Sequence, residues 1–298
     1  MVWDGARTDL AVESGGRTNT VPLGVERSTE RHAACILHRM TVATSEAAVA
    51  LGRPIGTYVT LECAPLHQLD RTETSRITEL LSEELRGMTR ALCGRFPGEA
   101  LGVLIAGLGN AKLTADAIGP ETVSRLHATR HLREHDPSLF RALGCSALSA
   151  LAPGVLGETG IETLELLRGA VRSVRPDLVV VVDALAARDC ARLASTIQLS
   201  DSGIVPGSGI GNLRTAITAE TLGVPVIALG VPTVVDSATL VCDALERANI
   251  EEIGDELAAV LENGRDFFVS PKESDLICAA VSSLFADAIT AAFVGDLG

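Results

Sequence analysis

Two aspartates lie where apolar, strand-like runs of the sequence end. Asp183 directly follows the run LVVVV, and Asp116 lies in the loop GLGNAKLTADAIGP after the run LGVLIA. Open α/β sheets bind ligands beyond the carboxyl ends of their strands, so both carboxylates are predicted at the functional edge. If the two strands are neighbours, the carboxyl groups can share one proton, which supplies a general acid and a general base together. The alternative is that each aspartate caps the helix that follows it.

Glycine-rich loops follow or flank the same strands. Gly107-Leu108-Gly109-Asn110 begins like a dinucleotide-binding loop, but Lys112 stands where the third glycine is required. The loop at 206–212 lacks the Lys-Ser/Thr pair of a phosphate loop, and the sequence places no histidine to activate Ser208 as a nucleophile. We expect both loops to flank the cleft and to hold a bound chain or an oxyanion through backbone amides. The residues assigned to them are Gly107, Gly109, Asn110, Gly207, Ser208 and Gly209.

A third pattern competes with the aspartates. His131-Leu132-Arg133-Glu134-His135 matches the H-x-x-E-H arrangement of some zinc peptidases, in which two histidines share a helix face beside a glutamate base. The sequence identifies no third ligand. The alternative is a polar helix end, where positively charged histidines are favoured near the negative pole of the helix dipole and Asp136-Pro137 ends the helix. We expect no bound metal and no other cofactor.

Strand-like and helix-like segments alternate along the chain and would position these residues. The run at 178–182 is apolar without alternation, which is typical of a central parallel strand covered on both faces. We expect strands at 57–63, 101–106, 178–182, 196–199 and 224–229, and helices at 70–95, 117–134, 161–174, 213–221 and 275–293. The first fifty residues are predicted to be irregular.

The composition excludes several classes of protein. Of the 298 residues 47% are hydrophobic and only 3% aromatic, so a folded α/β core of Val, Leu, Ile and Ala is expected. The formal net charge of -13 argues against direct nucleic-acid binding. The longest nearly apolar run, 224–235, is shorter than the ~20 residues that span a bilayer, so we expect a cytoplasmic protein without a membrane partner. The seven scattered cysteines contain no C-x-x-C pair and are expected to be reduced.

A series of longer motifs covers most of the chain. It comprises RTDLAVE at 7–13, GxYVTLE at 56–62, GLGN and TADAIGP within 107–120, TRHL at 129–132, PGVLGETGIET at 153–163, PDLVVVVDALAARD at 176–189, TIQLSDSGIVPGSGIGN at 196–212, ETLGVPVIALGVPTVVD at 220–236 and FVSPKE at 268–273. Short glycine patterns arise by chance, but an ordered series of this length does not. The chain resembles the germination protease family, the spore endopeptidases that degrade small acid-soluble spore proteins.

The resemblance implies both a fold and a chemistry. It implies an aspartic-type endopeptidase with a three-layer α/β fold and a mostly parallel central sheet, similar to hydrogenase maturation proteases. It also implies a homotetramer in the cytoplasm of the spore core, with small acid-soluble spore proteins as substrates. The family's two functional aspartates fall on Asp116 and Asp183, which weakens the capping alternative. One departure is the short connection at 242–266, where the family has a long segment.

The N-terminus resembles a cleavage site of the family. The family's substrate site is similar to Thr-Glu-Phe/Ile-Ala-Ser-Glu, cut after the first acid, and Thr8-Asp9-Leu10-Ala11-Val12-Glu13 matches it in type except at Val12. We expect a zymogen that cuts itself between Asp9 and Leu10. Residues 1–9 would be a pro-segment and 10–298 a single endopeptidase domain. The alternative is that RTDLAVE is an ordinary first strand or turn.

The expected mechanism divides the work between the two aspartates. One aspartate, ionised, would take a proton from water while the other, protonated, polarises the scissile carbonyl. The sequence does not assign the two roles. A zinc peptidase that uses His131, Glu134 and His135 and a non-catalytic α/β protein that binds a peptide in the same cleft remain as competing hypotheses.

Overall fold

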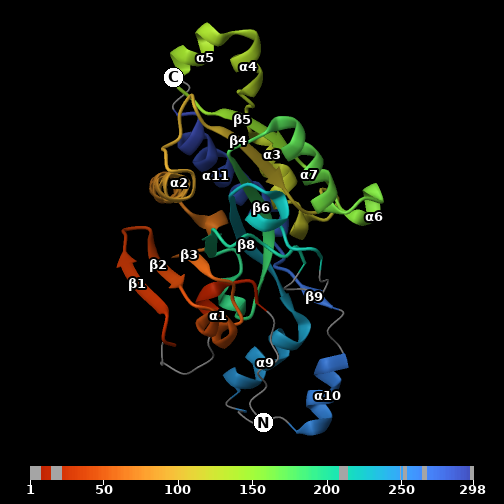
Figure 1. Cartoon of the computed structure of the whole chain (residues 1–298). Helices are drawn as coiled ribbons and strands as arrows, with labels where there is room; N and C mark the ends of the chain where they lie inside the picture. The colour runs from red at the N-terminus through yellow and green to blue at the C-terminus, as the bar shows by residue number, and fades with distance from the viewer. Residues whose placement is uncertain are drawn as a thin grey trace.

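The computed structural model describes residues 8–14, 22–207, 214–248, 250, 254–263 and 267–295. Within these residues one nine-stranded sheet runs through the protein in the order β1-β2-β3-β7-β8-β6-β4-β5, with β9 beside β8 (Figure 1). The strands are β1 (Val25–Arg31), β2 (Cys35–Val42), β3 (Gly56–Cys63), β4 (Gly102–Gly107), β5 (Ala147–Leu151), β6 (Leu178–Ala187), β7 (Thr196–Ser200), β8 (Val226–Asp236) and β9 (Phe268–Val269). The α-helices are α1 (Ser45–Leu51), α2 (Arg71–Cys93), α3 (Ile118–Arg125), α4 (Arg130–His135), α5 (Pro137–Leu143), α6 (Leu156–Thr159), α7 (Thr163–Val174), α8 (Ala219–Leu222), α9 (Ser237–Arg247), α10 (Asp255–Asn263) and α11 (Ser274–Phe293).

The strands β8, β6, β4 and β5 pair in parallel and have helices on both faces. Val180 and Val182 of β6 pack in the cluster that contains residues of α2, α3 and α11, whereas Val179 and Val181 pack in the cluster that contains residues of α7 and α8. Burial on both faces explains why β6 reads as an unbroken apolar run. The predicted three-layer α/β fold with parallel central strands is confirmed.

The other half of the sheet is antiparallel. Its strands β3 and β7 match the predicted strands at 57–63 and 196–199, but β1, β2 and the antiparallel pairing were not predicted. β7, β3, β2 and β1 extend the sheet from β8, each antiparallel to its neighbour. The prediction that the first fifty residues are irregular is therefore wrong, since β1, β2 and α1 all lie there. β1 is exposed on both faces after Val25, so its sequence lacks the alternation that identifies a strand, and only its pairing with β2 makes it one.

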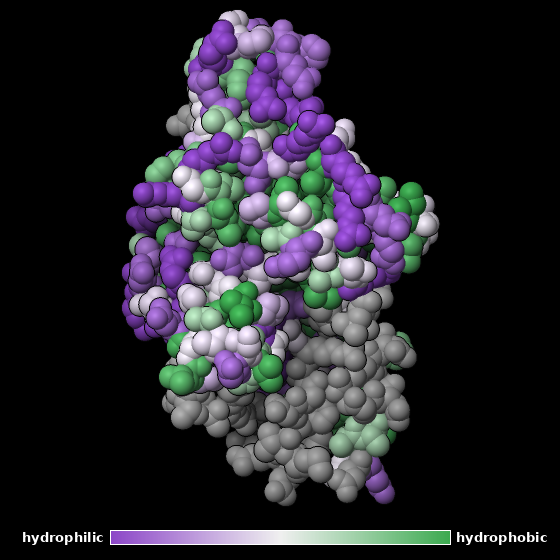
Figure 2. Space-filling model, in the orientation of Figure 1, coloured by the Kyte–Doolittle hydropathy of each residue, from purple (hydrophilic) through white to green (hydrophobic). Residues whose placement is uncertain are grey.

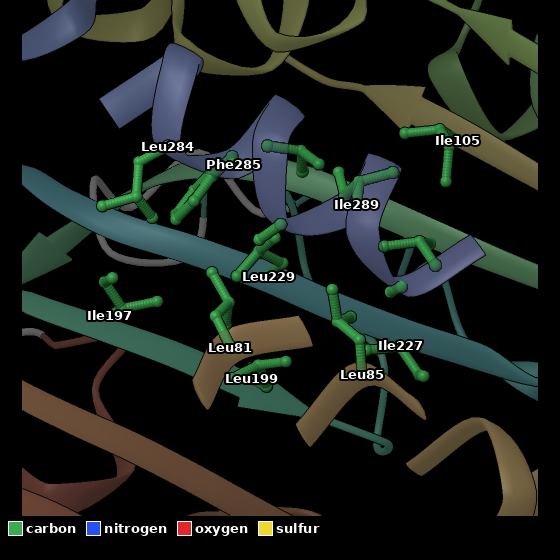
Figure 3. Close-up of a cluster of buried hydrophobic side chains, with 14 of the residues drawn as sticks. Leu81, Leu85, Ile105, Ile197, Leu199, Ile227, Leu229, Leu284, Phe285 and Ile289 are labelled. Carbon is green, nitrogen blue, oxygen red and sulfur yellow. The ribbon is translucent and has the colours of Figure 1, made fainter. Parts of the chain in front are cut away.

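The largest part of the core lies between the sheet and the helices α2 and α11 (Figure 3). Helix α2 begins with a capping box in which Asp70 and Glu73 each accept a hydrogen bond from the other's backbone N–H. It buries one face of aliphatic residues at spacings of three and four. The labelled residues in this cluster are Leu81, Leu85, Ile105, Ile197, Leu199, Ile227, Leu229, Leu284, Phe285 and Ile289.

Two predicted helices are shorter than expected. The segment 117–134 contains two helices, α3 and α4, because the chain is extended at Leu126. A helix does end before Pro137 as predicted, since α4 ends at His135, and Pro137 then begins α5, where its missing N–H costs no hydrogen bond. The Asp136 side chain caps α5 by accepting from the Leu139 N–H at 3.0 Å. The predicted helix at 213–221 is reduced to the single turn of α8.

Helix α11 is long and apolar enough to cross a membrane by length and composition, with a window of mean hydropathy 1.9. The prediction that the longest apolar run lies at 224–235 overlooked this segment. In the fold, 61% of that window is buried, and α11 packs against α2 and α3. Its apolar character is accounted for by its place in the core.

Candidate active site

Asp183 lies in the middle of β6 and is 6% exposed. It pairs with Gly230 of β8, and Gly230 pairs with Gln198 of β7. Directly paired residues project from the same face of a sheet, so Asp183 and Gln198 share a face, and Gly230 between them adds no side chain of its own. Because β6 continues to Ala187, the alternative in which Asp183 caps a helix is wrong. The Ala184 N–H donates to Asp183 Oδ1 at 3.0 Å.

Asp116 ends the 3-10 helix η3 (Thr114–Asp116), which follows the carboxyl end of β4. Strands β4 and β6 are direct neighbours, as the shared-proton hypothesis requires. The backbone N–H of Asn110 donates to Asp116 Oδ2 at 2.8 Å, which ties the carboxylate to the predicted glycine loop. The helix α3 has no side-chain cap, so the capping alternative is wrong for Asp116 as well.

The surroundings of Asp116 and Asp183 give the two carboxyl groups different pKa values. Burial raises the pKa of Asp183 well above its ordinary value, and the negative charges of Asp116 and Asp9 raise it further. Burial also raises the pKa of Asp116, but the hydrogen bond from Asn110 favours its ionised form. Asp183 is therefore the group that keeps its proton to higher pH.

Residues 8–14, which we call the docked segment, lie along β6 just beyond Asp183. Strand β4 pairs with β6 only as far as Val182. Further along β6, the Asp9 N–H donates to the Ala186 carbonyl at 2.9 Å and the Ala186 N–H donates to Asp9 Oδ2 at 2.8 Å. The predicted processing site is thus bound three residues after Asp183 on the same strand.

Two side chains donate to the carbonyl oxygen of Asp9. Arg53 Nη1 lies 2.9 Å from this oxygen, and Gln198 Nε2 also lies 2.9 Å from it. Gln198 Oε1 accepts from the Ala11 N–H at 2.5 Å, so one side chain holds the backbone on both sides of Leu10. Arg53 also donates to the carbonyl oxygens of Thr8 at 2.8 Å and Leu10 at 3.0 Å and to the Ser14 hydroxyl at 2.6 Å.

The residues after Asp9 are buried. Leu10 is 0% exposed and packs in a cluster with Leu185, Ala187 and Val235. Ala11 lies in a separate cluster that contains Met40 and Tyr58. These surroundings accept an apolar side chain at position 10 and a small one at position 11.

Glu13 anchors the far end of the docked segment. Its carboxylate accepts from the backbone N–H groups of Arg188 at 2.8 Å and Asp189 at 3.0 Å, and Arg192 Nε lies 3.4 Å away. Arg192 also forms an ion pair with Glu62. Glu13 is only 7% exposed, so backbone amides and a guanidinium group compensate its buried charge.

The predicted cleft loops are only partly described. Gly109 and Asn110 lie beside Asp116, whereas Gly107 lies against α3, where a Cβ atom on it would stand 2.1 Å from the Gly119 carbonyl oxygen. Gly207 has a φ of 72°, which is the left-handed conformation that glycine adopts without strain. Ser208 and Gly209 lie outside the described residues.

The histidine pattern lies on α4, apart from Asp116 and Asp183. Figure 1 shows α4 next to α5 at one end of the molecule. Figure 2 shows that this end is covered mainly by hydrophilic side chains. His131, Glu134 and His135 are exposed, and Glu134 pairs with Arg130 at 3.2 Å. In the described part of the chain, no three His, Cys, Asp or Glu side chains gather to hold a metal ion.

The side chains that hold the docked segment were not predicted from the sequence. Gln198 gives no clear signal in the sequence, because it lies on the polar face of the alternating strand TIQLS, and only the structure shows that it is 8% exposed. Arg53 and Arg192 carry no signal either, since a single arginine in a loop is usually a solvated surface residue.

Comparisons with known proteins show which family the chain resembles. The family model described as "Germination protease" matches residues 12–263. The germination protease of Caldanaerobacter subterraneus is 37% identical, with 97% of this chain and 94% of that protein covered. That of Clostridium perfringens is 39% identical, with 96% and 94% covered. That of Priestia megaterium is 44% identical over 70% of this chain and 55% of that protein.

Among solved structures, a hydrogenase maturation protease from Thermococcus kodakarensis matches with a TM-score of 0.32 and 18% identity. The match covers 64% of this chain and 93% of that one. The sequence comparisons, in contrast, extend over nearly the whole chain at well above 30% identity. The chain therefore belongs to the germination protease family and is an endopeptidase.

Proposed function

We propose that this germination protease is an aspartic-type endopeptidase, made as a zymogen, that cuts its own Asp9–Leu10 bond. Residues 1–9 are then the pro-segment and residues 10–298 the mature endopeptidase domain. Asp116 and Asp183 carry the hydrolysis.

The position of the Asp9–Leu10 peptide unit supports this proposal most strongly. Asp9 is hydrogen-bonded to Ala186 on the strand that carries Asp183, and its charge acts on Asp183. The carboxyl ends of parallel strands are where α/β sheets bind their ligands. The docked segment thus has the place of a substrate.

The pKa directions support a division of the two roles. Asp116, ionised and held by Asn110, takes a proton from a water molecule that attacks the carbonyl carbon of Asp9. Asp183 keeps its proton because it is buried between negative charges, and it gives this proton to the peptide group as the bond breaks.

The substrates in trans are small acid-soluble spore proteins, cut after an acidic residue in a Thr-Glu/Asp-apolar-Ala context. The surroundings of the docked segment support this context, because Leu10 fills an apolar cluster and Ala11 a tight one. Action in the cytoplasm of the spore core and assembly as a homotetramer belong to the same proposal and rest on the family resemblance.

Intact mass over time tests the proposal. The wild type and the variants Asp116→Asn and Asp183→Asn are incubated in mildly acidic buffer, with Asp275→Asn, an exposed residue at the start of α11, as the matched control. The wild type and the control are expected to lose residues 1–9, while the two site variants stay whole. Folded proteins that all remain uncut would overturn self-processing and favour a peptide-binding role.

A further inference from the structure

The scissile carbonyl of the docked segment has two donors that do not belong to the aspartate pair. Arg53 and Gln198 each donate to the Asp9 carbonyl oxygen at 2.9 Å. Preorganised donors on a reacting carbonyl stabilise the negative charge that develops on its oxygen. We propose that Arg53 and Gln198 are catalytic residues that form the oxyanion site of this enzyme. The proposal rests on cleavage at Asp9–Leu10 as set out above.

The sheet fixes Gln198 relative to Asp183. Both residues pair with Gly230, from opposite sides, and project from the same face. Neighbouring strands are about 4.8 Å apart, so the two backbones are separated by about 10 Å. Gly230 has no side chain of its own, and the Leu185 side chain lies over it, because a Cβ on Gly230 would stand 2.7 Å from Leu185 Cγ. Leu185 in turn packs in one cluster with Leu10, so the residue after the Asp9 carbonyl lies against this row.

A helix end fixes Arg53. Helix α1 ends at Gly52 in the left-handed conformation with a φ of 62°, and the Arg53 N–H closes the turn by donating to the Ala48 carbonyl at 3.0 Å. The guanidinium group then spans the carbonyl oxygens of Thr8, Asp9 and Leu10. Because these acceptors are neutral and a guanidinium group does not lose its proton, its positive charge faces the backbone that reacts.

The oxyanion site completes the chemistry. Asp116 takes a proton from water as the water oxygen bonds to the Asp9 carbonyl carbon, and the π electron pair moves onto the carbonyl oxygen. Arg53 Nη1 and Gln198 Nε2 hold that oxyanion. When it collapses, the C–N bond breaks and the Leu10 nitrogen takes the proton of Asp183, which leaves a carboxylic acid on Asp9 and an amine on Leu10.

Gln198→Glu is the sharpest test, because it keeps an acceptor for the Ala11 N–H and replaces the donor to the carbonyl with an ionisable oxygen. We expect self-processing to slow by about 100-fold or more near neutral pH, the usual loss for one oxyanion donor. The ratio of variant to wild-type rates should recover in acid, where the glutamic acid regains a proton to donate. Gln68→Glu, at an exposed position, is the matched control and should process at the wild-type rate.

Arg53→Lys tests the second donor while keeping the charge. Lysine is a point donor and does not span three carbonyl oxygens, so processing should slow by about tenfold or more. The control is Arg168→Lys, because Arg168 also donates to a backbone carbonyl, that of Thr221 at 2.9 Å, but on the exposed face of α7.

Hydrogen exchange at the backbone amides of residues 9 and 11 separates catalysis from docking. The proposal is supported if Gln198→Glu retains their protection but processes slowly. It is overturned if Gln198→Glu retains this protection and cuts itself at the wild-type rate. It is also overturned if the cleavage rate of Gln198→Glu falls only in proportion to the protection that the two amides lose. A wild type that never cuts itself overturns the proposed function instead, and the oxyanion site with it.

Discussion

Gly109 lies so close to Asp116 that a Cβ atom on the glycine would stand 2.0 Å from the Asp116 carbonyl oxygen. Its φ of 110° is also one that other residues rarely adopt. The loop after β4 can therefore bring Asp116 back to the Asn110 N–H only if residue 109 is glycine. The placement of the Asp116 carboxylate depends on this contact.

Gly109→Ala is expected to displace η3 and reduce self-processing by at least about 100-fold, since a misplacement of 1 Å can have that effect. Gly87→Ala is the matched control, because Gly87 lies in α2 with no atom near its Cβ position. Rates from intact mass, with circular dichroism to verify folding, check the prediction. Equal rates for both variants would show that the loop tolerates the change.

Asp183→Asn should stabilise the folded protein at neutral pH by about 1 to 3 kcal/mol, the scale of a strong single-residue effect. Asp183 has a raised pKa in the folded state, so the folded chain holds a proton that the unfolded chain releases. Stability therefore falls as pH rises from the ordinary aspartate pKa through the folded pKa. Asparagine does not ionise, so Asp183→Asn avoids this fall in stability. The difference in unfolding free energy between the variant and the wild type should vanish in strong acid. Urea unfolding at several pH values measures it.

Self-processing should accelerate from neutral pH into mild acid. The protonated fraction of Asp183 grows as pH falls through its raised pKa, while Asp116 must stay ionised to act as base. The rate should therefore pass through a maximum and fall again in stronger acid. A rate that is flat across this whole range would contradict a proton held by Asp183.

Glu13→Gln should slow self-processing by about tenfold, because the hydrogen bonds of a charged group contribute about 1.5 to 3 kcal/mol. The glutamine side chain lacks the negative charge of the Glu13 carboxylate, which Arg192 and two backbone N–H groups compensate. Glu26→Gln, on the exposed strand β1, should leave the rate unchanged. If both variants match the wild type, Glu13 does not set the register of the segment.

A chelator should leave the activity unchanged, and so should His131→Ala. His131 lies on the exposed helix α4, and its neighbour Glu134 already pairs with Arg130. Loss of processing in chelator, restored by added zinc, would revive the metallopeptidase hypothesis. Processing of the intact protein and of His131→Ala, each with and without chelator, separates the two cases.

The parallel half of the fold was predictable because burial on both faces leaves an unbroken apolar run, as in β6. The strand-end rule likewise selected Asp116 and Asp183, because each follows such a run in the sequence, but β6 continues past Asp183 to Ala187, so Asp183 lies within its strand. In the antiparallel half, β3 and β7 were predicted as strands. β1 was not predictable, because it carries polar residues on both faces and is a strand only through its pairing.

The contacts of the docked segment were beyond prediction for a different reason. Arg53 and Gln198 are separated by more than a hundred residues, and they meet at Asp9 only through the pairing of β3 with β7 and the end of α1. No local pattern encodes such a meeting. Gln198 lies on the polar face of the strand TIQLS, and a buried glutamine requires a polar partner, but the sequence shows neither its burial nor the identity of that partner.

The docked segment is part of the same chain as the site that it fills. A tethered ligand acts at an effective concentration of about millimolar, so its cleavage is a first-order event that dilution does not slow. While residues 8–14 stay in place, a second protein has to compete with a built-in copy of a cleavage sequence. Under the proposed function, the Asp9–Leu10 bond within the docked segment is also the first bond that the enzyme cuts.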